Sequence, residues 1–115
     1  MKYMLLIYQN EAAMQSARQA DIGQIMAAYG AYTEALKKAG VIVAGNPLEP
    51  STSATTVRVA NGKTNVLNGP YAETKEQLGG YYLIDVPDLD AALAWAARCP
   101  GASHGAMEVR ALRAM

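Results

Sequence analysis

Two segments of the sequence carry large apolar side chains on both of their alternating faces. Residues 2–9 read KYMLLIYQ, and residues 81–86 read YYLIDV, with Asp85 as the polar exception. Because successive side chains of a strand point to opposite sides, a strand that is apolar on both sides must be covered on both. The sequence therefore predicts a sheet whose two central strands are residues 2–9 and 81–86.

Two further segments show apolar residues at helical spacing. The first helix is expected to begin at Asp21 as its N-cap, with Gln24 at the capping-box position, and to end at Gly40. The second is expected to open at Pro87-Asp88 and to close at Pro100-Gly101. Its predicted apolar stripe consists of Leu89, Ala92, Leu93 and Ala96. These helices supply a cover for the sheet.

Shorter strands complete the predicted elements. Residues 41–44 form a strand that the following Gly-Asn-Pro turn ends, and residues 106–112 alternate as a half-exposed edge strand. Residues 55–60 and 63–67 flank Asn61-Gly62. A type I′ turn needs a positive φ at both central residues, which this pair adopts readily. We therefore expect a β-hairpin in this segment.

The order of the elements predicts the fold class. Apart from the hairpin it is β-α-β, β-α-β, the split pattern of the ferredoxin-like fold, and 115 residues leave room for one domain, residues 1–115. We expect an α+β domain with an inserted hairpin. In that fold both helices cover one face of the sheet, so the apolar residues of the other face need a different cover. A homodimer packed sheet to sheet is the expected solution.

Composition excludes several classes of function. The chain has 10 basic and 10 acidic residues, so it lacks the basic field that attracts nucleic acid or anionic membranes. One His and one Cys do not favour a metal site, and no motif indicates a cofactor. The longest apolar runs are far shorter than the roughly 20 residues of a membrane helix. With a single cysteine and no signal-peptide pattern, we expect a cytoplasmic protein.

Residues 68–86, NGPYAETKEQLGGYYLIDV, resemble the DGPF signature of the YCII-related proteins. The segments KYMLLIY, ATTVRVANGKT, DLDAALAWAARCP and HGAMEVRAL are similar to the same family, so the resemblance covers nearly the whole chain. It implies the fold of the dimeric α+β barrels. It also implies two possible functions, which are chemistry like that of muconolactone isomerase or a regulatory role beside alternative sigma factors.

Four residues depart from the pattern that the resemblance implies. Asn68 replaces the aspartate of the signature, and an amide cannot act as a general base. Tyr71 replaces phenylalanine, Met14 replaces a tryptophan of many relatives, and Tyr29 replaces a frequent histidine. If the aspartate is catalytic in the family, this chain has lost or changed the reaction.

Three residues are candidates for catalysis. Asn68 could orient a ligand through its amide, although Asn-Gly-Pro is also ordinary turn chemistry. Glu73 could act as a base if an apolar cleft raised its pKa, and the alternative is a salt-bridged cap of its loop. His104 is the only side chain with an ordinary pKa near neutrality, although a lone histidine before an edge strand is more often structural or exposed.

Five apolar or aromatic residues are candidates for binding a substrate, with ordinary core packing as the alternative. They are Tyr8, Met14, Met26, Tyr29 and Tyr71. Met14 lies in the segment of residues 11–20, which is expected to be a short helix or a lid. The leading hypothesis is a cofactor-independent protein that acts on a small organic molecule by proton transfer or isomerisation. The alternatives are a non-catalytic ligand-binding or sigma-factor-associated protein, and a scaffold whose pocket was redesigned for a non-natural reaction.

Overall fold

A four-stranded antiparallel sheet with the order β2-β5-β1-β6 forms the centre of the computed structural model, which describes residues 1–115. Its strands are β1 (Lys2–Gln9), β2 (Ile42–Pro47), β5 (Gln77–Asp85) and β6 (Ala106–Ala111). The two strands that are apolar on both faces, β1 and β5, lie side by side in the middle, as predicted. The half-apolar β6 pairs with β1 as an edge strand.

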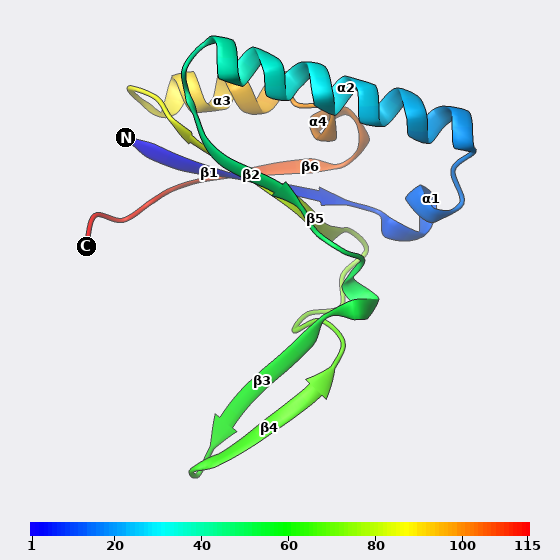
Figure 1. The fold of residues 1–115 in the computed structure, drawn as a ribbon. Coiled ribbons are helices and arrows are strands. Elements are labelled where there is room, and N and C mark those ends of the chain that lie inside the picture. The colour runs from blue at the N-terminus through cyan, green and yellow to red at the C-terminus, as the bar shows by residue number, and fades with distance from the viewer.

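The helices gather on one face of this sheet (Figure 1). They are α1 (Glu11–Gln15), α2 (Gln19–Lys38), α3 (Leu89–Arg98) and α4 (Gly101–His104), with a 3₁₀ turn, η1, at Ser51–Ser53. α1 occupies the first half of the segment 11–20, for which a short helix or a lid was expected. The α+β, ferredoxin-like fold with an inserted hairpin is confirmed. None of the helices combines the length and the apolar composition of a membrane span.

The core lies between this face and the helices. Its fully buried large side chains are Leu5, Leu36, Ile84 and Cys99. The ring of Tyr32 meets Tyr82 and Trp95 edge-on, with ring centroids 5.3 and 6.2 Å apart, a favoured aromatic geometry. Its hydroxyl donates to the Trp95 carbonyl at 2.7 Å, so this buried polar group has a partner. Tyr32 therefore ties α2 to both the sheet and α3.

The first long helix begins earlier than predicted. α2 starts at Gln19 with Arg18 as its N-cap. The backbone of Arg18 is extended, and its side chain makes no capping hydrogen bond. The predicted N-cap, Asp21, lies inside the first turn, where its carboxylate contacts the Arg18 Nε at 3.3 Å. Because Asp21 lies in the first turn, its negative charge interacts favourably with the positive end of the helix dipole.

The predicted end of α2 is confirmed. Gly40 has a φ of +72°, and its N–H donates to the Lys37 carbonyl at 3.0 Å. The Val41 N–H donates to the Leu36 carbonyl at 3.2 Å, which completes the paired bonds of a Schellman motif. This motif stops the helix and turns the chain into β2.

α3 follows its predicted cap but not its predicted apolar stripe. The Asp88 side chain caps the helix by accepting from the Ala91 N–H at 2.9 Å. Ala92 and Ala96 are buried, whereas Leu89 and Leu93 are 50% and 46% exposed. The small side chains face the sheet because they let α3 approach it closely, and the leucines lie toward solvent.

Two strands of the four-stranded sheet extend beyond their predicted bounds. β2 runs through the Gly-Asn-Pro segment that was expected to end it, and Pro47 pairs with Gly80. Proline is tolerated there because β2 is an edge strand. β5 begins at Gln77, four residues before its predicted start, so the glycine pair lies inside the strand. A Cβ on Gly80 would lie 3.0 Å from the Asn46 carbonyl oxygen, so glycine permits the two strands to approach.

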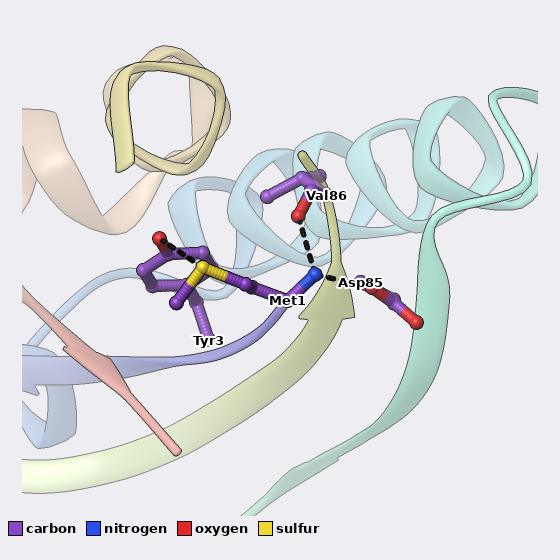
Figure 2. A network of polar contacts seen from close by, with 4 residues as sticks. All are labelled: Met1, Tyr3, Asp85 and Val86. Atoms are coloured by element: carbon purple, nitrogen blue, oxygen red, sulfur yellow. Dashed lines mark hydrogen bonds and ion pairs between the residues drawn. The ribbon is translucent and has the colours of Figure 1, made fainter. Parts of the chain in front are cut away.

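Polar contacts at the start of β1 join it to the end of β5 (Figure 2). The ammonium of Met1 donates to the Val86 carbonyl at 2.9 Å and contacts the Asp85 carboxylate at 3.1 Å. The Tyr3 hydroxyl donates to the Met1 sulfur at 3.7 Å. The ion pair is more than half exposed on both sides, so these contacts align the strands and add little stability.

The hairpin consists of β3 (Thr55–Ala60) and β4 (Lys63–Asn68), which form a separate two-stranded sheet. Asn61 and Gly62 have φ values of +52° and +76°, as the predicted type I′ turn requires. The hairpin projects away from the layers of the domain (Figure 1). The radius of gyration is accordingly 16.0 Å, against about 13 Å for a compact domain of this length.

Replacing Leu36 by alanine should lower the free energy of unfolding by about 3 kcal/mol, because it removes a fully buried side chain and leaves a cavity. The matched control, Leu93→Ala, should change it by about 0.5 kcal/mol or less, since exposed positions carry little packing. Urea denaturation measures both. Equal losses in the two variants would contradict this description of the core.

Candidate functional site

A cavity of about 190 Å³ lies between the sheet and the N-terminal part of α2. We call it the helix-side cavity. It is lined by Ile7, Gln9, Met14, Ile25, Met26, Tyr29 and by residues 46–48 and 79–82. None of these side chains carries a formal charge at neutral pH, so the cavity is suited to an uncharged molecule.

The sheet side of the helix-side cavity owes its shape to a bulge. β5 slips in register between the pairs Ile7–Gly80 and Tyr8–Leu78, which leaves Gly79 without a partner in β1. The Gln9 side chain lies over this glycine, where a Cβ would come within 2.8 Å of its Nε2. Gly79 therefore leaves room for an amide at the cavity wall. That amide can both donate and accept hydrogen bonds.

The hydroxyls at this cavity keep their protons at physiological pH. Burial is the main reason that the pKa of Tyr29 and of Tyr82 lies above the ordinary value. Thr33 donates its one hydroxyl hydrogen to the Tyr29 carbonyl at 2.9 Å. Tyr82 must therefore be the donor in the 2.8 Å contact between the Tyr82 and Thr33 hydroxyls.

Cys99 lies behind Tyr29 and is only 1% exposed. Burial raises the pKa of its thiol, outweighing the lowering by hydrogen bonds from Gly101 and Tyr29. A thiol that keeps its proton is a poor nucleophile. The helix-side cavity thus contains hydrogen-bond donors and acceptors but no group that is ionised near neutral pH.

A larger cavity, of about 670 Å³, lies at the root of the hairpin. We call it the arm-root cavity. It is lined by Tyr8, Leu48, Glu49, Ser51, residues 54–57, residues 70–72, Thr74, Gln77 and Leu78. It therefore borders both the sheet and the hairpin, and the loop that carries the signature residues forms part of its wall.

Hydrogen bonds hold the segments around the arm-root cavity together. Gln77 donates through Nε2 to the Thr74 carbonyl at 2.6 Å and accepts at Oε1 from the Glu11 N–H at 3.0 Å. The Glu11 carboxylate accepts from the Ser51 N–H at 2.7 Å and from its hydroxyl at 2.6 Å. These contacts tie α1, η1 and the start of β5 to one another.

The predicted binding residues divide between the two cavities. Met14, Met26 and Tyr29 line the helix-side cavity, although they come from two helices. Met26 is 67% exposed, so it lies at the rim. Tyr8 and Tyr71 line the arm-root cavity. Tyr71 is 76% exposed, and the Arg58 guanidinium lies 5.0 Å from the centre of its ring.

The three candidate catalytic residues line neither of the two cavities. Asn68 is the exposed last residue of β4 and pairs with Thr55. Glu73 is exposed in the loop before β5, and His104 is exposed at the end of α4. Their catalytic roles stay predictions. No group of three or more His, Cys, Asp or Glu side chains is placed to hold a metal ion.

Sequence reasoning missed one polar side chain of the helix-side cavity, Gln9. Asn46 also borders this cavity, but its side chain donates to the Tyr81 hydroxyl at 3.1 Å, and its pairing with Tyr81 places both side chains on the face of the sheet away from the helices. Gln9 interrupts the apolar run of its strand at the end nearest the cavity, and that interruption was the one available signal.

The model of the YCII-related domain matches residues 1–115. The chain belongs to the YCII-related family. It is 39% identical, over 114 residues, to the uncharacterized protein R00369 of Rhizobium meliloti (strain 1021). That alignment covers 97% of this chain and 92% of the relative.

Among solved structures, the YCII-related chain is similar to 5-chloro-2-hydroxyhydroquinone dehydrochlorinase (TftG) from Burkholderia phenoliruptrix AC1100. The TM-score is 0.57 at 18% identity, and the match covers 98% of this chain and 94% of TftG. TftG was solved in complex with 2,5-dihydroxybenzoquinone. At this identity the likeness shows a common fold and does not transfer the reaction.

The buried tyrosines should make stability fall at high pH. Because the pKa of Tyr29 is raised in the folded state, the unfolded chain releases its proton first, near pH 10, and the stabilising effect is lost as pH rises toward the folded pKa. Urea unfolding at pH 8 and pH 11 should therefore show a larger loss for the wild type than for Tyr29→Phe. Parallel losses would contradict the assignment of a raised pKa to Tyr29.

Proposed function

We propose that this protein binds a small, uncharged organic molecule with a single ring bearing hydroxyl or carbonyl oxygens, in the helix-side cavity. The observation that carries the proposal is the lining of this cavity. It combines apolar walls with amide and phenol groups and contains no charged side chain. Binding sites for small molecules commonly have this composition, in which apolar surface gives affinity and a few polar groups fix orientation.

The size of the cavity limits the ligand. A buried volume of roughly 150 Å³ accepts a benzene-sized molecule. The helix-side cavity, at about 190 Å³, therefore fits one six-membered ring with small substituents. Two fused rings would have to displace the side chains at the rim, where Met26 is exposed and mobile enough in its rotamers to adapt.

The polar groups favour oxygen-bearing rings. The Gln9 amide can donate to a ligand carbonyl or accept from a ligand hydroxyl. An anionic ligand would lose its hydration without meeting a cation, because no lysine or arginine lines the cavity. The oxygen-bearing ring bound by TftG supports the class of ligand proposed here, through fold likeness alone.

The same groups favour binding over chemistry within the cavity. A general base must be deprotonated at the working pH so that it can accept a proton. The pKa values of Tyr29, Tyr82 and Cys99 are all raised, so these groups keep their protons. Proton transfer or isomerisation would need a group from outside the cavity, for which Asn68, Glu73 and His104 remain the sequence-based candidates. We therefore propose ligand binding as the primary function of the site.

Resorcinol, an uncharged dihydroxybenzene, should bind to the wild-type protein in calorimetry or ligand-observed NMR. Ile25→Trp should weaken this binding by tenfold or more, because the larger side chain fills the cavity. Gln9→Leu should weaken the binding of resorcinol and leave the binding of toluene unchanged or stronger, since only the oxygenated ring forms hydrogen bonds with the amide.

The matched control is Ala28→Trp, which places the same side chain on an exposed position of α2 outside the cavity. It should bind resorcinol like the wild type. 4-Hydroxybenzoate, which adds a carboxylate to a similar ring, should bind more weakly than resorcinol. The proposal is wrong if Ile25→Trp and Ala28→Trp bind resorcinol equally well.

We also propose that the protein is a homodimer whose sheets pack against each other. The face of the sheet away from the helices carries six large apolar side chains that are only partly buried. They are Met4, Leu6, Tyr8, Leu78, Tyr81 and Leu83. No element of the chain covers this face, which we call the open face, and an apolar patch in the centre of a sheet is typical of an interface.

Sedimentation equilibrium at micromolar concentration should give the mass of a dimer. Leu6→Glu should shift the protein to monomers, because it places two carboxylates in a desolvated symmetric contact. Leu93→Glu, on the exposed side of α3, should leave the dimer intact. A monomeric wild type would rule out the sheet-to-sheet contact.

A further inference from the structure

One face of the hairpin carries three valines and no charged side chain, whereas the other carries both basic residues together with Leu67. In an antiparallel pair, directly opposed residues point to the same side. Val57 pairs with Val66, and Val59 pairs with Thr64, so the three valines share one face. Arg58 and Lys63 lie on the opposite face, since they alternate with the valines. We call the first of these surfaces the valine face.

The valine face is unusually exposed for three β-branched residues at neighbouring positions. Val57, Val59 and Val66 are 59%, 68% and 61% exposed. The rest of the chain does not cover them, because the hairpin extends away from the layers of the domain (Figure 1). A two-stranded hairpin is marginally stable by itself in water, so packing against another surface is needed to hold it.

The valine face and the open face of the sheet meet at the arm-root cavity. Tyr8 and Leu78, which oppose each other on the open face, line this cavity together with Val57 of the hairpin. The two apolar surfaces are therefore continuous, and the sheet and the hairpin form the two limbs of an angle. A body that covers the open face would also lie against the root of the hairpin.

A second copy of the chain is the occupant that best fits this angle. Arg58 and Lys63, the two positive charges of the hairpin, lie on the face opposite the valines. The valine face of one copy can therefore contact a second copy without bringing these charges into the contact. The chain has no net charge to oppose self-association. In a twofold contact each copy supplies one hairpin and one uncovered sheet, which satisfies both surfaces at once.

We propose that the hairpin is a dimerisation arm, whose valine face packs on the second copy and closes the arm-root cavity at the interface. This inference rests on the sheet-to-sheet dimer proposed above and adds the contact that fixes the arm. The arm-root cavity is bordered by both the open face and the arm of one chain, so a second copy that covers both would supply its remaining wall.

A pair of double variants tests the arm. Val59→Glu with Val66→Glu places one carboxylate on each strand of the valine face. Ala60→Glu with Asn65→Glu does the same on the opposite face of the same strands, with the same change of net charge. In sedimentation equilibrium, the dissociation constant of the dimer should be at least tenfold higher than in the wild type for the first variant. It should lie within twofold of the wild-type value for the second.

Amide hydrogen exchange of residues 55–68 gives a second readout that does not depend on altering the arm. Exchange in the wild-type dimer should be slower than in the monomeric Leu6→Glu variant, because the arm loses its cover when the dimer separates. The arm contact is wrong if the wild type is a dimer, both double variants dimerise with equal affinity, and residues 55–68 exchange equally fast in the wild-type dimer and in the Leu6→Glu monomer. That outcome would leave the sheet-to-sheet contact in place. A monomeric wild type would overturn both.

Discussion

The packing of α2 determines where the helix-side cavity lies. Only the C-terminal part of this helix is buried, through Tyr32 and Leu36, and Tyr32 joins it to both the sheet and α3. The Schellman motif at Gly40 then fixes the passage into β2. Because the helix is held at this end, its N-terminal part extends beyond the core and covers the sheet there, with Tyr29 and Met26 lining the space between them. The helix-side cavity is the space that this arrangement leaves.

The small size of the core leaves apolar surface uncovered elsewhere in the molecule. Only 13 of 115 residues are buried, although half of the residues are hydrophobic, so much apolar surface stays uncovered in a single chain. Part of that surface lies on the open face and on the valine face of the arm, which adjoin at the arm-root cavity. One symmetric contact would cover both, which gives the inserted hairpin a structural purpose and relates the arm-root cavity to the dimer.

The sequence predicts the elements whose signals are local. Asn61-Gly62 gives the hairpin through its backbone preference, and double-faced apolar strands give the centre of the sheet. The predicted start of α2 was wrong because the helix begins at Gln19 after an N-cap, Arg18, that makes no side-chain capping bond, so the capping preference of Asp21 did not indicate it. The site was predicted only in part. Met14 and Tyr29 meet there, but the amide of Gln9 reaches the cavity through a bulge at Gly79 that depends on tertiary pairing.

The most direct test of the central claim is the carbon-13 methyl spectrum of the methionines during a titration with resorcinol. Six methionines report on different parts of the chain, and only Met14 and Met26 line the helix-side cavity. The signals of these two should shift with the ligand, while Met4 on the open face should not. Shifts confined to Met4, or none at saturating resorcinol, would contradict a ligand site beneath α2.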